Sequence, residues 1–103
     1  MKSIYSIVGM KFRPGMVEFV ASLPIGEPLQ LRREPDNKFD PNAVQVWARA
    51  AHVGYIKGSQ AAEVAQNMDA NSASMLRANL AISNDGWPMA EVDESPPGRD
   101  DIG

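Results

Sequence analysis

The residues best suited to chemistry stand close together in the segment 33–42, which has the sequence REPDNKFDPN. An aromatic ring, Phe39, lies there between a cation and a carboxylate, Lys38 and Asp40. Two prolines in the segment restrict the backbone to a narrow range of conformations. A connection that only reverses the chain needs no more than Asn-Gly or Asp-Gly. We therefore expect a functional loop between two strands.

Few groups in the sequence suit catalysis or metal binding. His52 is the only histidine, and a lone histidine at the start of a strand is more often a surface or hairpin residue than a base. Asp36 and Asp40 have the spacing of calcium ligands, but Lys38 takes the next ligand position and Pro41 replaces the sharp-turn glycine. We expect Asp36 to bond its own backbone instead. The prediction is a non-enzyme with no catalytic residue, no cofactor and no metal.

Four sequence blocks in and around the loop resemble the HIRAN domain family. The first looks like the opening strand and basic-aromatic step of that family, and the others look like its central hallmark. In chain order they are Val8-Gly9-Met10-Lys11-Phe12, Arg33-Glu34-Pro35, Asn37-Lys38-Phe39-Asp40-Pro41-Asn42-Ala43-Val44 and Gly54-Tyr55-Ile56. The likeness covers roughly Ser3 to Met68.

The resemblance implies binding to the 3′ end of single-stranded DNA, usually within enzymes that remodel DNA at damaged replication forks. It implies that Phe39 contacts the terminal base or sugar and that Asp40 accepts a hydrogen bond from the free 3′ hydroxyl. The residue types agree, because rings stack on bases and cations bind phosphates. The predicted nucleic-acid-binding residues are Lys11, Phe12, Arg13, Lys38, Phe39, Asp40, Tyr55 and Lys57.

Each of these roles has a structural alternative. The rings of Phe39 and Tyr55 could pack in the core, and Asp40 and Asn42 could brace the loop. For Asn42 we favour bracing.

Two departures from the family pattern predict fewer contacts with DNA. Phe12 and Phe39 lack the hydroxyl that tyrosine often supplies at these positions, and Gly58 replaces a second cation that often follows Lys57. The second hypothesis is therefore a protein-interaction module or adaptor that uses a strand edge or the loop and has lost DNA binding. The third is a purely structural barrel.

The net charge of -3 hides two parts of opposite sign. Residues 1–90 hold nine basic and eight acidic residues, a net charge of +1, and residues 91–103 hold one basic and five acidic residues, a net charge of -4. Any basic face must therefore come from the first half of the chain. Its cations are Lys2, Lys11, Arg13, Arg32, Arg33, Lys38, Arg49 and Lys57.

Apolar residues recur more often at period two than at period 3.6, which indicates a mainly β fold. The alternation predicts three strands, one that contains Leu29 and Leu31, one over 44–48 and one over 76–82. In the third strand, Leu76, Ala78, Leu80 and Ile82 are expected to face the core. Apolar stripes in 16–23 and 61–68 predict two helices, the second with Ser59 as its N-cap. Asn84-Asp85-Gly86 predicts a turn before a strand from Trp87 to Val92.

Six short strands and two short helices predict a small OB-like β-barrel, as the HIRAN resemblance also implies. We expect one domain over residues 1–92 and a disordered acidic tail over 93–103. With no cysteine, no signal peptide and no uncharged apolar run near the roughly 18 residues of a membrane span, we expect a monomeric, soluble, cytoplasmic protein without a membrane partner. Its expected partners are single-stranded DNA and a DNA-processing enzyme acting in trans.

Overall fold

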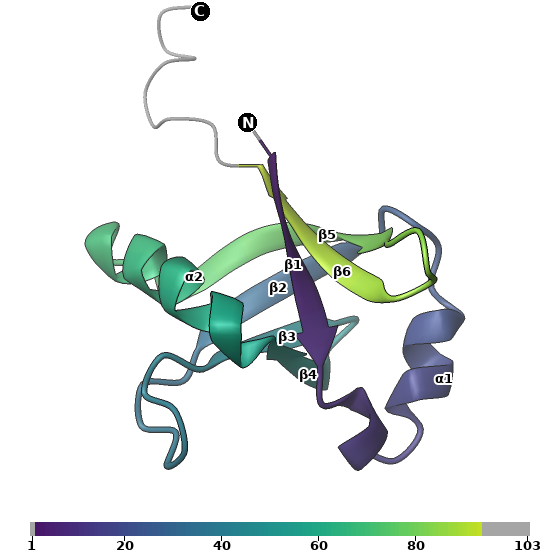
Figure 1. Ribbon diagram of the computed structural model, residues 1–103, viewed down its shortest axis with the longest axis horizontal. Coiled ribbons are helices and arrows are strands. Elements are labelled where there is room, and N and C mark those ends of the chain that lie inside the picture. The colour runs from purple at the N-terminus through teal and green to yellow at the C-terminus, as the bar shows by residue number, and fades with distance from the viewer. Residues whose placement is uncertain (1, 94–103) are drawn as a thin grey trace, which may run out of the picture.

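The computed structural model describes residues 2–93 and confirms the predicted six-stranded barrel (Figure 1). The strands are antiparallel and close in the order β1-β4-β3-β2-β5-β6. They are β1 (Lys2–Val8), β2 (Pro28–Arg33), β3 (Val44–Ala48), β4 (Ala51–Ile56), β5 (Met75–Ile82) and β6 (Pro88–Asp93). The helices are a 3-10 turn, η1 (Met10–Phe12), the short α1 (Met16–Ala21) and the longer α2 (Gly58–Ala70). Within residues 2–93, no helix has the length and apolar character that crossing a membrane requires. The predicted tail lies outside the described residues except for Asp93.

The core follows the predicted alternation with one exception. Leu31, Val44 and Val46 are fully buried inside the barrel, and the apolar stripe of α2 closes one end of it. The exception is Ile82, which was expected in the core but is 43% exposed. It lies where β5 pairs with the first residue of β6, Pro88, at the rim of the barrel. The alternation therefore continues beyond the part of the strand that has a core to face.

Helix α2 begins before the predicted cap. Its N-cap is Lys57, so the assignment of Ser59 was wrong. The Lys57 N–H donates to the Ser6 carbonyl at 2.9 Å, and the Ser6 N–H donates to the Gln60 side chain at 2.8 Å. These bonds attach the first turn of α2 to β1, and a contact distant in sequence therefore fixes where the helix starts.

The turn between β3 and β4 also depends on a distant partner. Arg49 and Ala50 have φ of 49° and 68°, which is the conformation that a two-residue hairpin needs and that glycine or asparagine usually provides. Arg49 forms a forked ion pair with the buried Glu27, with both N–O distances 3.0 Å. This ion pair stabilises a left-handed turn that contains neither glycine nor asparagine.

Closure of the barrel requires a glycine in β4. Strand β1 pairs with β4 through only two residues, and beside this short contact Gly54 faces the β1 backbone. A Cβ atom on Gly54 would lie 2.5 Å from the Val8 carbonyl oxygen, closer than real Cβ atoms approach. The glycine of the family-like Gly54-Tyr55-Ile56 block thus lets the β1 backbone lie close against β4.

We expect Gly54→Ala to lower the free energy of unfolding by about 1–3 kcal/mol, because the backbone must move to admit the methyl group. Denaturant unfolding followed by circular dichroism measures the change. Gly58→Ala is the matched control, since its Cβ would meet nothing within 4 Å. Equal stability of the two variants would show that the β1–β4 contact is not tight.

Candidate nucleic-acid interface

The loop between β2 and β3 is attached to the barrel through Glu34. Its carboxylate accepts hydrogen bonds from the Gln45 amide on β3 at 2.6 Å, the Tyr55 hydroxyl on β4 at 2.8 Å and the Asn37 amide in the loop at 2.9 Å. The Gln45 hydrogen bond is the main reason that the pKa of Glu34 is lowered. Burial, and then the bond to Glu34, raises the pKa of the Tyr55 hydroxyl. An ionised carboxylate therefore joins two strands to the loop.

Side chains within the loop fix its backbone. The side-chain Oδ1 of Asn37 accepts from the backbone N–H groups of Phe39 and Asp40 at 2.9 and 3.0 Å, so Asn37 has the role that was expected of Asp36. One carboxylate oxygen of Asp40 accepts from the Asn42 backbone N–H at 2.8 Å. Bracing is thus part of what Asp40 does, and Asn42 takes part through its backbone.

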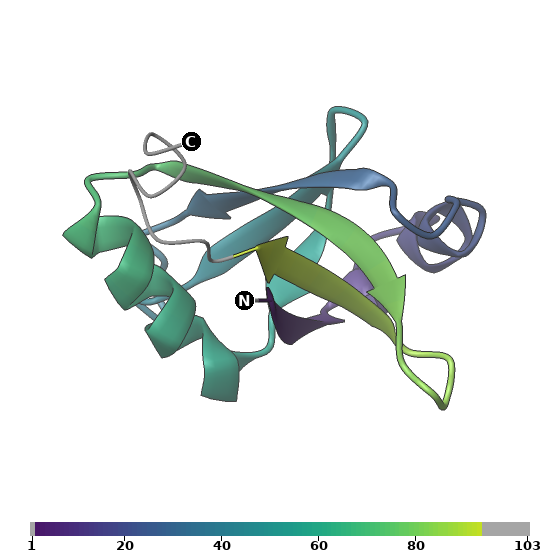
Figure 2. The same cartoon turned by 90° about the horizontal axis from the view of Figure 1, so that it is seen from above.

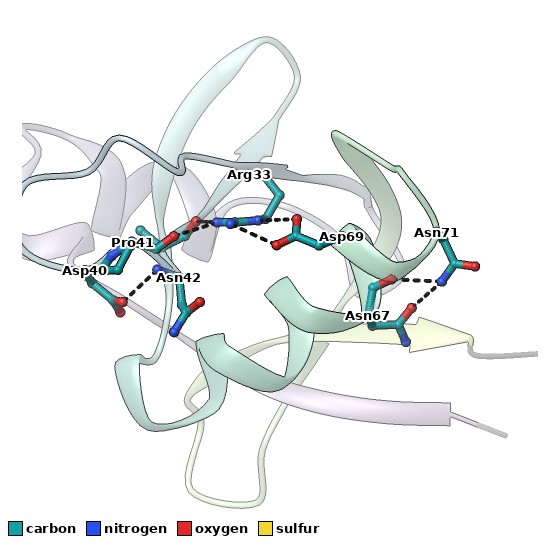
Figure 3. Close-up of polar contacts among 8 residues, drawn as sticks. Arg33, Asp40, Pro41, Asn42, Asn67, Asp69 and Asn71 are labelled. Carbon is teal, nitrogen blue, oxygen red and sulfur yellow. Dashed lines mark hydrogen bonds and ion pairs between the residues drawn. The ribbon is translucent and has the colours of Figure 1, made fainter.

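Arg33 ties the far side of the loop to α2. Its guanidinium donates to the Asp69 carboxylate at 3.0 and 3.2 Å and to the backbone carbonyls of Pro41 and Ala43, both at 3.1 Å. Figure 3 shows Arg33 between Asp69 and Pro41. The Arg33 side chain is only 10% exposed, and its hydrogen bonds lower the pKa of Asp69. Arg33 had been counted among the cations of a possible basic face, but its charge is used inside the protein.

The predicted contact residues of the loop face outward. Phe39 is 96% exposed, which rules out core packing for this ring. Lys38 beside it is exposed, and Asp40 is half-buried. The loop therefore presents a ring, a cation and a carboxylate on a backbone that Glu34 and Arg33 hold in place.

A second group of predicted residues lies on and just after η1. Lys11 and Phe12 are exposed, with the ammonium nitrogen 5.2 Å from the centre of the ring. Arg13 turns toward β4, where its Nε donates to the His52 carbonyl at 2.9 Å. Lys11 and Phe12 line an apolar groove of about 730 Å³ between α1 and the turn that joins β5 to β6.

Tyr55 lies between the two groups. Its hydroxyl bonds to Glu34 on the loop side, and its ring lies 3.9 Å from the place that a Cβ on Gly9 would occupy, next to η1. Among residues 2–93, no hydrogen bond or ring contact joins the loop directly to Lys11 or Phe12. Half-buried Tyr55 is therefore the link between the two halves of the predicted site.

Trp87 belongs to this surface and was missed by the sequence analysis. Its indole N–H donates to the Ile7 carbonyl at 2.9 Å, yet 47% of the residue stays exposed. Trp87 lines the groove of Lys11 and Phe12, and it also lines a second hollow of about 450 Å³ with Lys57. The sequence places it one residue after a turn signal, and only the fold brings that turn to η1.

We expect Glu34→Gln to lower the free energy of unfolding at neutral pH by about 1–3 kcal/mol, because three donors lose their charged acceptor. Since the pKa of Glu34 is lowered from 4.5, its contribution is present above that pH and is lost as pH falls through the lower folded value. Thermal unfolding across this range should show a weaker acid dependence in Glu34→Gln. Glu18→Gln on exposed α1 is the control, and equal behaviour of both variants would contradict this role.

Comparison with known proteins agrees with the fold and with the family resemblance. The family model of the HIRAN domain matches residues 2–87. The crystal structure of a Lactobacillus plantarum protein is similar, with a TM-score of 0.68 and 22% identity over 90% of this chain and 100% of that one. The HIRAN domain of human HLTF is similar with a TM-score of 0.63 and 22% identity over 90% of this chain and 77% of that one. No curated protein matches the sequence. The family match spans most of the chain, and the protein belongs to the HIRAN domain family.

Proposed function

We propose that this protein binds single-stranded DNA at a free 3′-hydroxyl end, without catalysis, in DNA repair or replication-fork processing. The observation that carries the proposal is the pair Phe39–Asp40, a fully exposed ring beside a carboxylate on a braced loop. The HIRAN family resemblance supplies the ligand class. A DNA-processing enzyme acting in trans is the proposed protein partner.

Asp40 has the right chemistry for a strand end. One of its oxygens accepts from Asn42, and the other makes no hydrogen bond among the described residues. An ionised carboxylate only accepts hydrogen bonds, so the free oxygen suits the proton of a 3′ hydroxyl. Phe39 would stack on the terminal base or sugar, and Lys38 would bind a phosphate.

The residues around η1 would hold the strand next to its end. Lys11 and Lys57 are exposed cations for phosphates, and Arg13 keeps donors beyond the one that it gives to His52. Phe12 and Trp87 both line the groove and would offer rings to bases. Tyr55 would line the passage from this group to Asp40.

A protein-interaction module is the second candidate, and the apolar groove favours it. Its lining includes Val17, Ile25 and Ile82, which are exposed and carry no charge. Such a surface suits a protein segment better than a phosphate backbone. The two candidates differ in whether the ligand has a 3′ end.

We expect an oligonucleotide with a 3′ phosphate to bind at least roughly tenfold more weakly than one with a 3′ hydroxyl, or about 1.4 kcal/mol. The phosphate would bring like charge close to the half-buried carboxylate of Asp40. Fluorescence anisotropy with labelled oligonucleotides at fixed salt measures both affinities, and a 5′ phosphate should matter little. Equal affinity for the two 3′ ends would turn the proposal toward the interaction module.

Asp40→Asn should remove most of this preference while the loop stays folded, because the amide oxygen can still accept from the Asn42 N–H. Asp36→Asn is the matched control, since Asp36 is an exposed carboxylate of the same loop. The preference should survive in that control. An unchanged preference in Asp40→Asn would remove Asp40 from end recognition.

Lys11→Ala and Phe12→Ala should weaken binding in different ways. Loss of Lys11 should lower the slope of log affinity against log salt by about 0.7, whereas loss of Phe12 should cost about 1–3 kcal/mol at every salt concentration. Phe12 is 78% exposed, so its loss should leave the circular dichroism spectrum unchanged. Ile25→Ala is the control for the ring, because Ile25 is 75% exposed in the same groove. Equal losses for Phe12→Ala and Ile25→Ala would argue against base stacking.

A further inference from the structure

Strand pairing arranges outward-facing side chains in two rows across β5, β2, β3 and β4. The rows follow from the register of the three strand pairs, because each residue of a row is the pairing partner of its neighbour on the adjacent strand. The first row is Arg77, Gln30, Trp47 and His52, and the second is Met75, Arg32, Gln45 and Tyr55. We call these eight side chains the outer face. All are exposed or half-buried, and three interstrand gaps of about 4.8 Å make the rows about 14 Å wide.

A β-bulge completes the aromatic part of the outer face. Trp47 pairs with His52, and Gln45, two residues before Trp47, pairs with Tyr55, three residues after His52. In a regular strand, residues three apart point to opposite sides. The extra residue in β4 therefore brings both His52 and Tyr55 to the outside.

The three rings of the outer face contact one another in a row that ends beside the proposed end-binding site. Trp47 and His52 stack with their centres 5.3 Å apart and their planes 9° apart, and His52 meets the Tyr55 ring edge-on at 5.0 Å. The Arg32 guanidinium lies 4.1 Å from the centre of the Trp47 ring. Because the Tyr55 hydroxyl also donates to Glu34 beside the loop, this row of rings is continuous with the proposed end-binding site.

The charge of the outer face is positive. Its charged members are Arg32 and Arg77, and none of the eight side chains is a carboxylate. At its edge, Arg13 donates to the His52 carbonyl. The Glu34 carboxylate borders the outer face and accepts from Gln45 and Tyr55, and from Asn37 in the loop. Burial first, and then the charge of Arg13, lowers the pKa of His52. Figure 2 shows α1 and α2 at opposite ends of the barrel, so neither described helix covers the sheet between them.

We propose that the outer face is a second binding surface for single-stranded nucleic acid and carries the nucleotides 5′ of the terminal one. Bases would stack on Trp47 and His52, and Arg32 and Arg77 would bind phosphates. A base that enters the stack on Trp47 displaces the Arg32 guanidinium, which then reaches a phosphate. The direction of the strand rests on the proposed function, because Tyr55 is the common member of the two surfaces.

The two tryptophans allow each surface to be observed separately. In Trp87→Phe, the fluorescence of Trp47 reports on the outer face, and in Trp47→Phe, Trp87 reports on the groove near η1. The probes are oligothymidylates of about 3 and about 10 nucleotides, shorter than and within the usual site size of an OB fold. The longer oligomer should quench the Trp47 fluorescence and bind at least roughly tenfold more tightly than the shorter one. The shorter oligomer should leave the Trp47 fluorescence unchanged.

Charge substitutions test the same surface without replacing an aromatic residue. Arg32→Gln with Arg77→Gln should lower the slope of log affinity against log salt by about 1.4 for the longer oligomer, or about 0.7 for each phosphate contact. Lys2→Gln is the control, because Lys2 lies on β1, outside the four strands of the outer face. Its removal should leave the slope unchanged.

The outcomes separate the outer face from end recognition. Unchanged Trp47 emission at saturating longer oligomer, while Trp87 emission changes, would overturn the outer face alone. Equal quenching of Trp47 by oligomers with a 3′ hydroxyl and a 3′ phosphate, at equal affinity, would support the outer face and overturn end recognition. No binding of either oligomer at low salt would overturn both.

Discussion

The carboxylate of Glu34 is the interaction on which the candidate site depends. It accepts from β3, β4 and the loop, and it stays ionised because these donors lower its pKa. On the other side of the loop, Arg33 bonds two backbone carbonyls and Asp69. The loop is therefore held from both sides before any ligand arrives, and a ring as exposed as Phe39 can be presented with less entropy left to lose on binding.

Some basic residues serve the structure and others lie on the surface, and side-chain chemistry suits Arg33 and Arg49 to the first role and the lysines to the second. Arg33 and Arg49 both make forked ion pairs with a carboxylate, since the planar guanidinium offers several donors in a fixed geometry. The lysines Lys11, Lys38 and Lys57 are exposed around the candidate site. A strongly hydrated ammonium on a flexible stem suits phosphate contacts that form and break. The positive charge available to a ligand is therefore smaller than the count of cations suggests.

Exposed apolar residues gather beside the candidate site. The groove beside η1 collects Phe12, Val17, Ile25, Ile82 and Trp87, which are among the large apolar residues that the barrel leaves exposed. A gathered patch of this kind is unfavourable in water and is typical of a binding surface. The loop, the groove and the outer face meet around Tyr55, so one residue of β4 links three surfaces.

The sequence by itself determined the barrel, its main core positions and the family. Period-two alternation depends only on local backbone geometry, and the loop block combines residue types that a plain turn does not need. Tertiary structure decided the start of α2 at Lys57, the exposure of Ile82 and the role of Arg33 inside the protein. It also decided that Trp87 lies near Lys11 and that a bulge brings His52 and Tyr55 to one side. Each of these features depends on a partner distant in sequence or on a one-residue change of register, and neither leaves a periodic signal in the chain.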